Sequence, residues 1–248
     1  MCKNTYLYHM HQIRLIYLYL FVFMGFLSAC TTKKSSEHHL PKTTAPAEKK
    51  AVEQPQNTIK AYFEPLTDKT AIPFLQQYGK DHKENKVRIE TPLGSFDILL
   101  FEQTPYHRAN FIFLTKQQYF DNTYFHRVVP NFIIQGGNSD NMDTGQKRRK
   151  IGKYLLPPDT RNGLKHHRGV VSMPSSEIEN PHKLASPYEF FIVQQDPGAY
   201  HLDGKYTVFG KVIRGMDVVD AINALPTDKR EWPLTNMRMR VTVLKNKP

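Results

Sequence analysis

The sequence predicts a mainly β protein, a closed β-barrel with helices over its ends. Three observations carry this prediction: many short segments alternate apolar and polar residues, two segments have apolar residues at helical spacing, and turns containing glycine separate them. A chain with many strands and few helices can bury its apolar faces by closing the sheet on itself. Beyond the first 58 of the 248 residues, about 190 remain, which is enough for one sizeable core.

The first 29 residues have the pattern of an export signal. Lys3 and Arg14 supply basic charge, and the apolar run at 15–27 is short for a bilayer span but suits a signal-peptide core. The run ends in Leu-Ser-Ala followed by Cys30, which resembles the lipobox of bacterial lipoproteins. That resemblance implies cleavage before Cys30 and a lipid on its thiol. An uncleaved anchor with an incidental cysteine is the alternative, and translation from Met10 instead of Met1 would leave a more usual signal.

Two segments separate this signal from the main domain. Residues 30–58 contain no aromatic residue and cannot bury enough apolar surface to fold, so we interpret them as a disordered tether. A flexible chain of that length spans roughly 30 Å. Residues 59–85 predict a short helical preface, with Phe74, Leu75 and Tyr78 as its apolar contacts.

Apolar alternation begins at residue 86 and defines the main domain over 86–248. Two strands around a turn at 91–94 open it, and Pro105 then starts a predicted helix that runs to about residue 117. A second helix is predicted over about 216–224, where Val218, Ile222 and Leu225 are spaced at i, i+4 and i+7. The other predicted strands cover residues 124–128, 132–135, 169–173, 189–193, 206–212 and 237–244.

Residue usage excludes several kinds of site. Cys2 and Cys30 are the only cysteines, so the main domain has neither a disulfide nor a cysteine metal site. His166 and His167 are adjacent and would diverge on a strand, and no HExxH is present, so we expect no catalytic metal. The chain has no G-x-S-x-G, no GxGxxG and no P-loop, and Ser172 is interpreted as a serine at the core edge, not a nucleophile.

The chain is basic, with a formal net charge of +11. Such a charge favours nucleic acid, anionic lipid or acidic protein surfaces as partners, and the export signal argues against nucleic acid. The densest basic run, Lys147 to Lys150, is predicted to be a solvated loop, with a patch for an anionic partner as the alternative.

Four motifs follow one another along the main domain: YFDNTYFHRVVPNFIIQGG, HHRGVVSM, FFIVQQ and LDGKYTVFGKVIRGMDVVDAI. Together they resemble the cyclophilin-type peptidyl-prolyl isomerases. The resemblance covers about residues 87–244 and is highly specific in order and spacing. It implies an eight-stranded antiparallel barrel that isomerises X-Pro bonds without a cofactor.

The resemblance also implies roles for individual residues. Rotation about an X-Pro bond breaks no covalent bond, but it gives the proline nitrogen a lone pair, and a fixed donor aimed there stabilises the twisted state. Arg127 is implied to be that donor, and Gln135 to hold the substrate backbone. We interpret His126 as structural because the reaction needs no proton transfer. The proline pocket is implied to be lined by Phe132, Ile133, Phe191 and Leu202, with Tyr206 as a wall.

The remaining substrate-binding positions depart from the family's usual residues. Glu189 replaces a usual glutamine, and its carboxylate could pair with Arg127 and weaken it. Pro174 and Ser175 replace a small-residue stretch, with loss of one backbone N–H, and His201 falls where Trp or Phe is common. Two functions therefore stay open: an active isomerase, and a proline-peptide-binding module or holdase chaperone with weak or no turnover.

The signal and the resemblance together predict where the protein acts. We expect a monomer that is anchored to a bacterial cell-envelope membrane through a lipid on Cys30, faces the periplasm and assists the folding of exported proteins. Its partners would be X-Pro segments of unfolded or exported proteins. Thr31 and Thr32 lack the aspartate of an inner-membrane retention signal, which slightly favours the outer membrane.

Overall fold

The computed structural model describes residues 64–175 and 181–245. The predicted signal peptide, the lipidation site Cys30, the tether and the beginning of the helical preface lie outside the described residues. No described helix has both the length and the apolar character that a membrane crossing requires.

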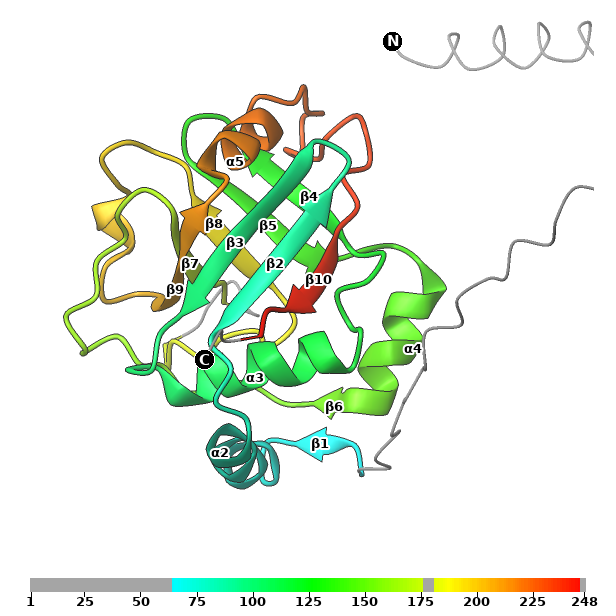
Figure 1. Ribbon diagram of the computed structural model, residues 1–248, viewed down its shortest axis with the longest axis vertical. Helices are drawn as coiled ribbons and strands as arrows, with labels where there is room; N and C mark the ends of the chain where they lie inside the picture. Colours follow the sequence, from blue (N-terminus) through cyan, green and yellow to red (C-terminus); the bar gives the residue numbers. More distant parts are fainter. Residues whose placement is uncertain (1–63, 176–180, 246–248) are drawn as a thin grey trace, which may run out of the picture. The chain divides into compact units, whose positions relative to one another are not determined.

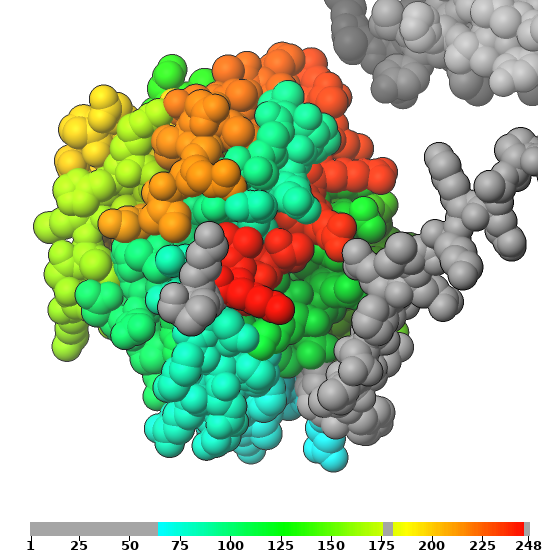
Figure 2. All heavy atoms as spheres, viewed as in Figure 1, coloured from blue at the N-terminus to red at the C-terminus, as the bar shows by residue number. Residues whose placement is uncertain are grey.

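Eight antiparallel strands form one curled sheet (Figure 1). Their order is β10-β2-β3-β9-β7-β8-β5-β4, and each of the eight predicted strand segments is present. The C-terminal β10 pairs with β2, and Figure 2 shows the red C-terminal residues lying against blue-green residues of the early strands. The strands are β2 (Lys86–Thr91), β3 (Gly94–Leu100), β4 (Tyr124–Val129), β5 (Ile133–Asn138), β7 (Val170–Met173), β8 (Phe190–Val193), β9 (Thr207–Arg214) and β10 (Arg240–Val243).

The prediction of a closed barrel is wrong, because the sheet is a curled half-barrel whose ladder ends at β4 and β10. Residues 237–239, just before β10, join these two ends through one bridge between Tyr124 and Arg238 and through single backbone bonds such as Phe125 N–H to Met237 O (2.9 Å). We call this junction the seam. The register of β4 against β5 shifts on both sides of Phe125, the residue whose N–H binds across the seam, so β4 is irregular at this junction.

The described residues contain four α-helices, two more than the barrel prediction placed on the domain. The helices predicted at 105–117 and 216–224 are confirmed as α3 (Pro105–Lys116) and α5 (Met216–Asn223). The helical preface contains α2 (Ala71–Asp81). A two-residue parallel pair, β1 (Leu66–Thr67) with β6 (Gly152–Lys153), lies outside the main sheet.

The fourth helix, α4 (Met142–Ile151), contains the basic run that was predicted to be a loop, so that prediction is wrong. Thr144 and Ile151 are its buried residues, and Lys147 Nζ lies 3.2 Å from Asp143 Oδ2 one turn earlier. The basic residues fill the last turn, where positive charge interacts favourably with the helix dipole. With so few apolar residues, α4 leaves almost no periodic signal in the sequence.

Aromatic rings fill the main core. The ring of Phe111 on α3 lies 4.7 Å from Phe120, 5.4 Å from Phe190 on β8 and 5.6 Å from Phe209 on β9, measured between centroids. Arg108, also on α3, donates to the main-chain carbonyls of residue 79 in the last turn of α2 and of residues 82 and 84 just after it. The main core covers one face of β4, β5 and β8, and their opposite face takes no part in it.

Candidate active site

Strand register places the key side chains of two separate motifs in one row. Arg127 on β4 is the direct partner of Gln135 on β5, and Gln135 is the direct partner of Phe191 on β8. Directly opposed residues of antiparallel strands point to the same face of a sheet. A guanidinium, an amide and an aromatic ring therefore lie side by side.

This face carries a second apolar cluster that is separate from the main core. Successive residues of a strand point to opposite faces, so Ile134 and Ile192 enter the main core while Ile133 and Phe191 enter the second cluster. The second cluster consists of buried Ile133, Phe191, Val193 and Ala199, with Val129, Phe132, Leu202 and Tyr206 packed against them. Strands β5 and β8 are thus apolar on both faces, although only one face is needed for the core.

The cluster forms the floor of a pocket of about 540 Å³. The structure brings together every predicted site residue of the main domain except Glu189. The residues lining the pocket are Arg127, Phe132, Ile133, Gln135, Pro174, Ser175, Phe191, His201, Leu202 and Tyr206. His201 is exposed and its ring stacks on Phe132 at 5.3 Å.

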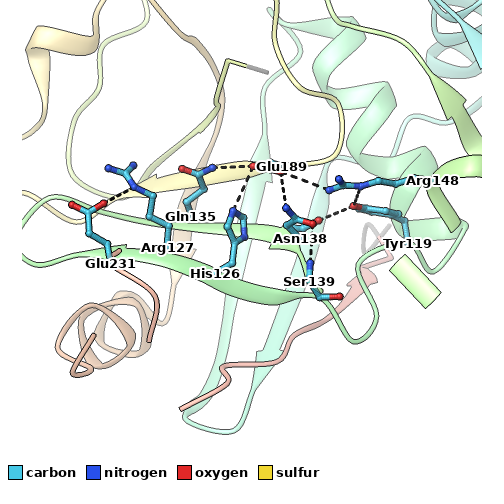
Figure 3. A network of polar contacts seen from close by, with 10 residues as sticks. Tyr119, His126, Arg127, Gln135, Asn138, Ser139, Arg148, Glu189 and Glu231 are labelled. Atoms are coloured by element: carbon cyan, nitrogen blue, oxygen red, sulfur yellow. Dashed lines mark hydrogen bonds and ion pairs between the residues drawn. The ribbon is translucent and has the colours of Figure 1, made fainter. Parts of the chain in front are cut away.

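Glu189 does not contact Arg127, so the expected pair between them is wrong. Its carboxylate accepts hydrogen bonds from Gln135 Nε2 (2.9 Å) and Asn138 Nδ2 (3.2 Å), and lies 3.5 Å from His126 Nε2 and 3.7 Å from an Arg148 nitrogen (Figure 3). The reason is register, because Glu189 lies just before β8 and two residues before Phe191, and is therefore displaced along the chain from the row that holds Arg127.

These neighbours set the charge of Glu189. Burial would raise the pKa of its carboxyl, but hydrogen bonds and positive charge from His126, Gln135 and Arg148 outweigh burial and hold the pKa below its ordinary value. Glu189 is therefore an ionised carboxylate at neutral pH. It accepts a hydrogen bond from the amide of Gln135, which lines the pocket, and His126 lies beside it.

Arg127 is held by a residue that the sequence motifs did not indicate. Its Nε donates a 2.6 Å hydrogen bond to Glu231 Oε2, and each of these side chains is 40% exposed. Figure 3 shows the dashed line from Glu231 ending on Nε and on neither of the two terminal guanidinium nitrogens of Arg127. Glu231 follows Arg127 by 104 residues and lies in a stretch of several charged residues, so no local pattern singles it out.

A buried polar chain supports the pocket floor. The ring of His166 stacks on Phe191 at 6.1 Å, its Nδ1 lies 2.9 Å from Asp203 Oδ1, and its Nε2 lies 3.2 Å from Ser172 Oγ. Burial lowers the pKa of His166 more than Asp203 raises it, so the ring is neutral at neutral pH. Ser172 is fully buried and donates to the carbonyl of Thr207 (2.7 Å), so it is not a nucleophile.

The two adjacent histidines diverge, as predicted. While His166 faces Asp203, His167 Nδ1 lies 2.9 Å from the Tyr200 hydroxyl. Among the residues that the structure describes, no three or more metal-ligating side chains of histidine, cysteine, aspartate or glutamate come together.

Residues 86–243 match the family model described as cyclophilin type peptidyl-prolyl cis-trans isomerase/CLD. A peptidyl-prolyl cis-trans isomerase of Acinetobacter baylyi is 39% identical over 57% of this chain and 73% of its own length. A peptidyl-prolyl cis-trans isomerase-like 1 protein of Neurospora crassa is 36% identical over 62% of this chain and 90% of its own length. The match to a peptidyl-prolyl cis-trans isomerase-like 2 protein of Rhizopus delemar, 36% identical over 66% of this chain, spans only 29% of that longer protein.

Solved structures agree with these relatives. A crystal structure of a cyclophilin type peptidyl-prolyl cis-trans isomerase of Cryptosporidium parvum is 29% identical and has a TM-score of 0.55 over 66% of this chain and 99% of its own. A second crystal structure of that protein, determined in the presence of the dipeptide Ala-Pro, has a TM-score of 0.54. The motifs, the curled sheet and the family match over residues 86–243 lead to one conclusion: this chain belongs to the family of cyclophilin-type peptidyl-prolyl cis-trans isomerases.

Proposed function

We propose that this chain catalyses cis–trans isomerisation of X-Pro bonds and that Arg127 is the donor that stabilises the twisted bond. The observation that carries the proposal is the row Arg127, Gln135 and Phe191, which sets a cation and an amide at the edge of an apolar pocket. The proline ring would enter the pocket over Phe191, and Gln135 would hold the adjoining backbone. The Ala-Pro dipeptide named with the Cryptosporidium parvum structure supports this class of ligand.

The arrangement suits a reaction whose barrier is rotational. Amide resonance opposes rotation by roughly 18–20 kcal/mol, and the twisted state differs from the planar state by a lone pair on the proline nitrogen. A guanidinium whose terminal nitrogens face the pocket stabilises that lone pair more than it stabilises the planar amide. The apolar floor removes water from the bond and so strengthens this interaction.

Exchange measurements on a short Ala-Pro peptide test the proposal. The full chain in detergent should accelerate cis–trans exchange, followed by NMR, and Arg127→Ala should lower kcat by about a hundredfold, the usual cost of losing a transition-state donor. Arg127→Lys should rescue poorly because an ammonium lacks the planar fork. Arg149→Ala, on the exposed side of α4, is the matched control and should keep full activity. Undiminished exchange in Arg127→Ala would refute the assigned role.

The same assay addresses the binding-only alternative. A proline-peptide-binding module or holdase would broaden or shift the peptide signals without accelerating exchange. That alternative drew support from Glu189 as a partner of Arg127, and Glu189 instead contacts Gln135, Asn138 and His126. We therefore favour turnover.

We further propose that the enzyme works on exported proteins at a bacterial membrane, held there by a lipid on Cys30. The support is the apolar run at 15–27 followed by Leu-Ser-Ala-Cys, and the outer membrane is slightly favoured by the absence of aspartate after Cys30. Cys30→Ser should leave the protein unlipidated, either soluble or retained as a precursor. Membrane fractionation decides this, and a membrane-bound product of mature size from Cys30→Ser would refute the anchor.

A further inference from the structure

The loop at residues 226–233, which we call the Glu231 loop, is held together by its own hydrogen bonds. The carboxylate of Asp228 accepts from the backbone N–H groups of Arg230 (2.8 Å) and Trp232 (2.9 Å), and a backbone bridge closes the base of the loop. Glu231 has φ of +64°, a left-handed conformation that residues other than glycine rarely adopt. The fold of the loop therefore fixes the position of Glu231 independently of any side chain that Glu231 contacts.

The loop binds the outer edge of β4. The carbonyl of Glu231 accepts a 2.8 Å hydrogen bond from the N–H of Val128, the residue after Arg127. The ring of Trp232 lies 5.8 Å from that of His126, the residue before Arg127. Strand β4 thus contacts the Glu231 loop on both sides of Arg127. The Glu231 side chain lies between these two contacts, against the guanidinium of Arg127.

The hydrogen bond to Glu231 uses the Nε–H of Arg127 and leaves the N–H groups on its terminal nitrogens available to a substrate. A guanidinium has one N–H on Nε and four on its terminal nitrogens. In the described part of the chain, the terminal nitrogens of Arg127 make no hydrogen bond to protein, and Figure 3 shows the contact with Glu231 ending on Nε alone. The other nearby carboxylate, Glu189, is occupied by His126, Gln135, Asn138 and Arg148 and does not compete for them.

We infer that Glu231 is a positioning residue, which holds the Nε side of Arg127 so that the terminal nitrogens face the proline pocket. The inference rests on the proposed function of Arg127 as the donor. Because both side chains are 40% exposed, the pair adds little to stability, and its main effect is on orientation. A carboxylate also weakens the positive field of the guanidinium. This effect lowers the rate, whereas orientation of the terminal nitrogens raises it.

Three variants separate orientation from charge. Glu231→Ala removes the acceptor and the charge, Glu231→Gln keeps an acceptor oxygen but removes the charge, and Glu90→Ala removes a matched exposed charge on β2. We expect Glu231→Ala to lower kcat by about tenfold, as misplacement of a catalytic group does. The KM should change by less than about twofold, because the lost interaction acts in the transition state. Glu231→Gln should keep most of kcat and Glu90→Ala all of it. Faster exchange in both Glu231 variants, or unchanged kcat in Glu231→Ala, would overturn the inference.

The Arg127 Nε–H signal gives a readout that does not depend on turnover. It is identified in ¹H–¹⁵N spectra by its loss in Arg127→Ala, and it should exchange with water more slowly in the unmodified chain than in Glu231→Ala. Retained backbone signals of β4 and β5 would show that Glu231→Ala still folds. Equal rates of exchange of Arg127 Nε–H with water in the unmodified chain and in Glu231→Ala would contradict the inference that Glu231 positions Arg127. If Arg127→Ala loses activity and Glu231→Ala does not, only the positioning inference fails; if the unmodified chain lacks activity, the proposed function fails.

Discussion

Replacing Glu189 by glutamine should destabilise the protein at neutral pH without speeding the reaction. The carboxylate uses both oxygens, one for Gln135 Nε2 and one for Asn138 Nδ2. In Glu189→Gln one oxygen becomes an NH₂ group, which faces one of these donors and cannot accept from it. His126 and Arg148 lose their nearby negative charge as well.

The size of the effect follows from one lost hydrogen bond to a charged group in a largely buried site. The Glu189 side chain is 19% exposed, and such a bond contributes about 1.5–3 kcal/mol. We expect the free energy of unfolding to fall by about 1.5–3 kcal/mol. This corresponds to a melting temperature lower by about 3–12 °C, at roughly 2–4 °C per kcal/mol for a domain of this size.

The loss should depend on pH in a definite direction. The pKa of Glu189 is held below its ordinary value of 4.5, so the ionised carboxylate stabilises the fold above that pH. This contribution is lost as pH falls below 4.5 and through the lowered pKa, because the unfolded chain binds a proton on this carboxyl more readily than the folded protein does. The difference between the unmodified chain and Glu189→Gln should therefore be constant above about pH 5 and shrink below pH 4.

Urea unfolding at pH 7 and pH 3.5 measures both effects. Circular dichroism reports the sheet, and fluorescence of Trp232, the single tryptophan, reports the loop beside β4. Glu90→Gln, exposed on β2, is the matched control and should change little. Equal stability at pH 7, or an undiminished difference at pH 3.5, would refute the reasoning. A several-fold rise in turnover would instead restore the idea that Glu189 weakens Arg127.

Three other substitutions test contacts outside the pocket. Arg108→Ala leaves three carbonyls at the end of α2 without their donor and should cost about 2–4 kcal/mol, with faster hydrogen exchange in α2 than in β3. Gly137→Ala places a Cβ 2.3 Å from the Tyr188 carbonyl oxygen at a φ of +100° and should cost more than about 2 kcal/mol, whereas Gly163→Ala, with open space around it, should cost about 1 kcal/mol in urea unfolding. Asn110→Leu removes both hydrogen bonds of a fully buried amide, to a carbonyl and a tyrosine hydroxyl, and should lower stability by about 2–4 kcal/mol in the same measurement; a smaller loss would mean that water replaces the amide.

Local pattern predicted most of the fold. Alternation located all eight strands, and Pro105 marked the start of α3 because proline suits the first turn of a helix. Helix α4 was not predicted because its apolar residues are too few for a periodic signal. Its stability depends on contacts such as the hydrogen bond from Lys147 to the carbonyl of Asp121. Barrel closure was predicted wrongly because it depends on pairing between distant residues, and the register shifts around Phe125 are invisible in the sequence.

The residues that line the pocket could be named from specific motifs, and the structure brings them together, but their polar partners could not be named. Glu189 was assigned to Arg127 because both are site residues of opposite charge, while the register of β8 directs it to Gln135 and Asn138. Glu231 could not be found, since it lies among other charged residues and acquires its role only when its loop meets β4. The pairing of these charged side chains therefore depended more on the register between strands and loops distant in sequence than on residue type.

The seam between β4 and β10 has a consequence for the order in which the protein becomes functional during synthesis. A ribosome releases β2 and β4 early, but among the described residues their outer edges are covered by β10, residues 237–239 and the Glu231 loop, all of which follow residue 225. A nascent chain halted at residue 225 would already carry every residue that lines the pocket, yet it would expose two unpaired strand edges and leave Arg127 without Glu231. Exposed edges are templates for pairing with other chains. Synthesis of residues 226–243 is thus the step that both covers these edges and supplies Glu231 to Arg127, and a product truncated at residue 225 should aggregate before it can act as an enzyme.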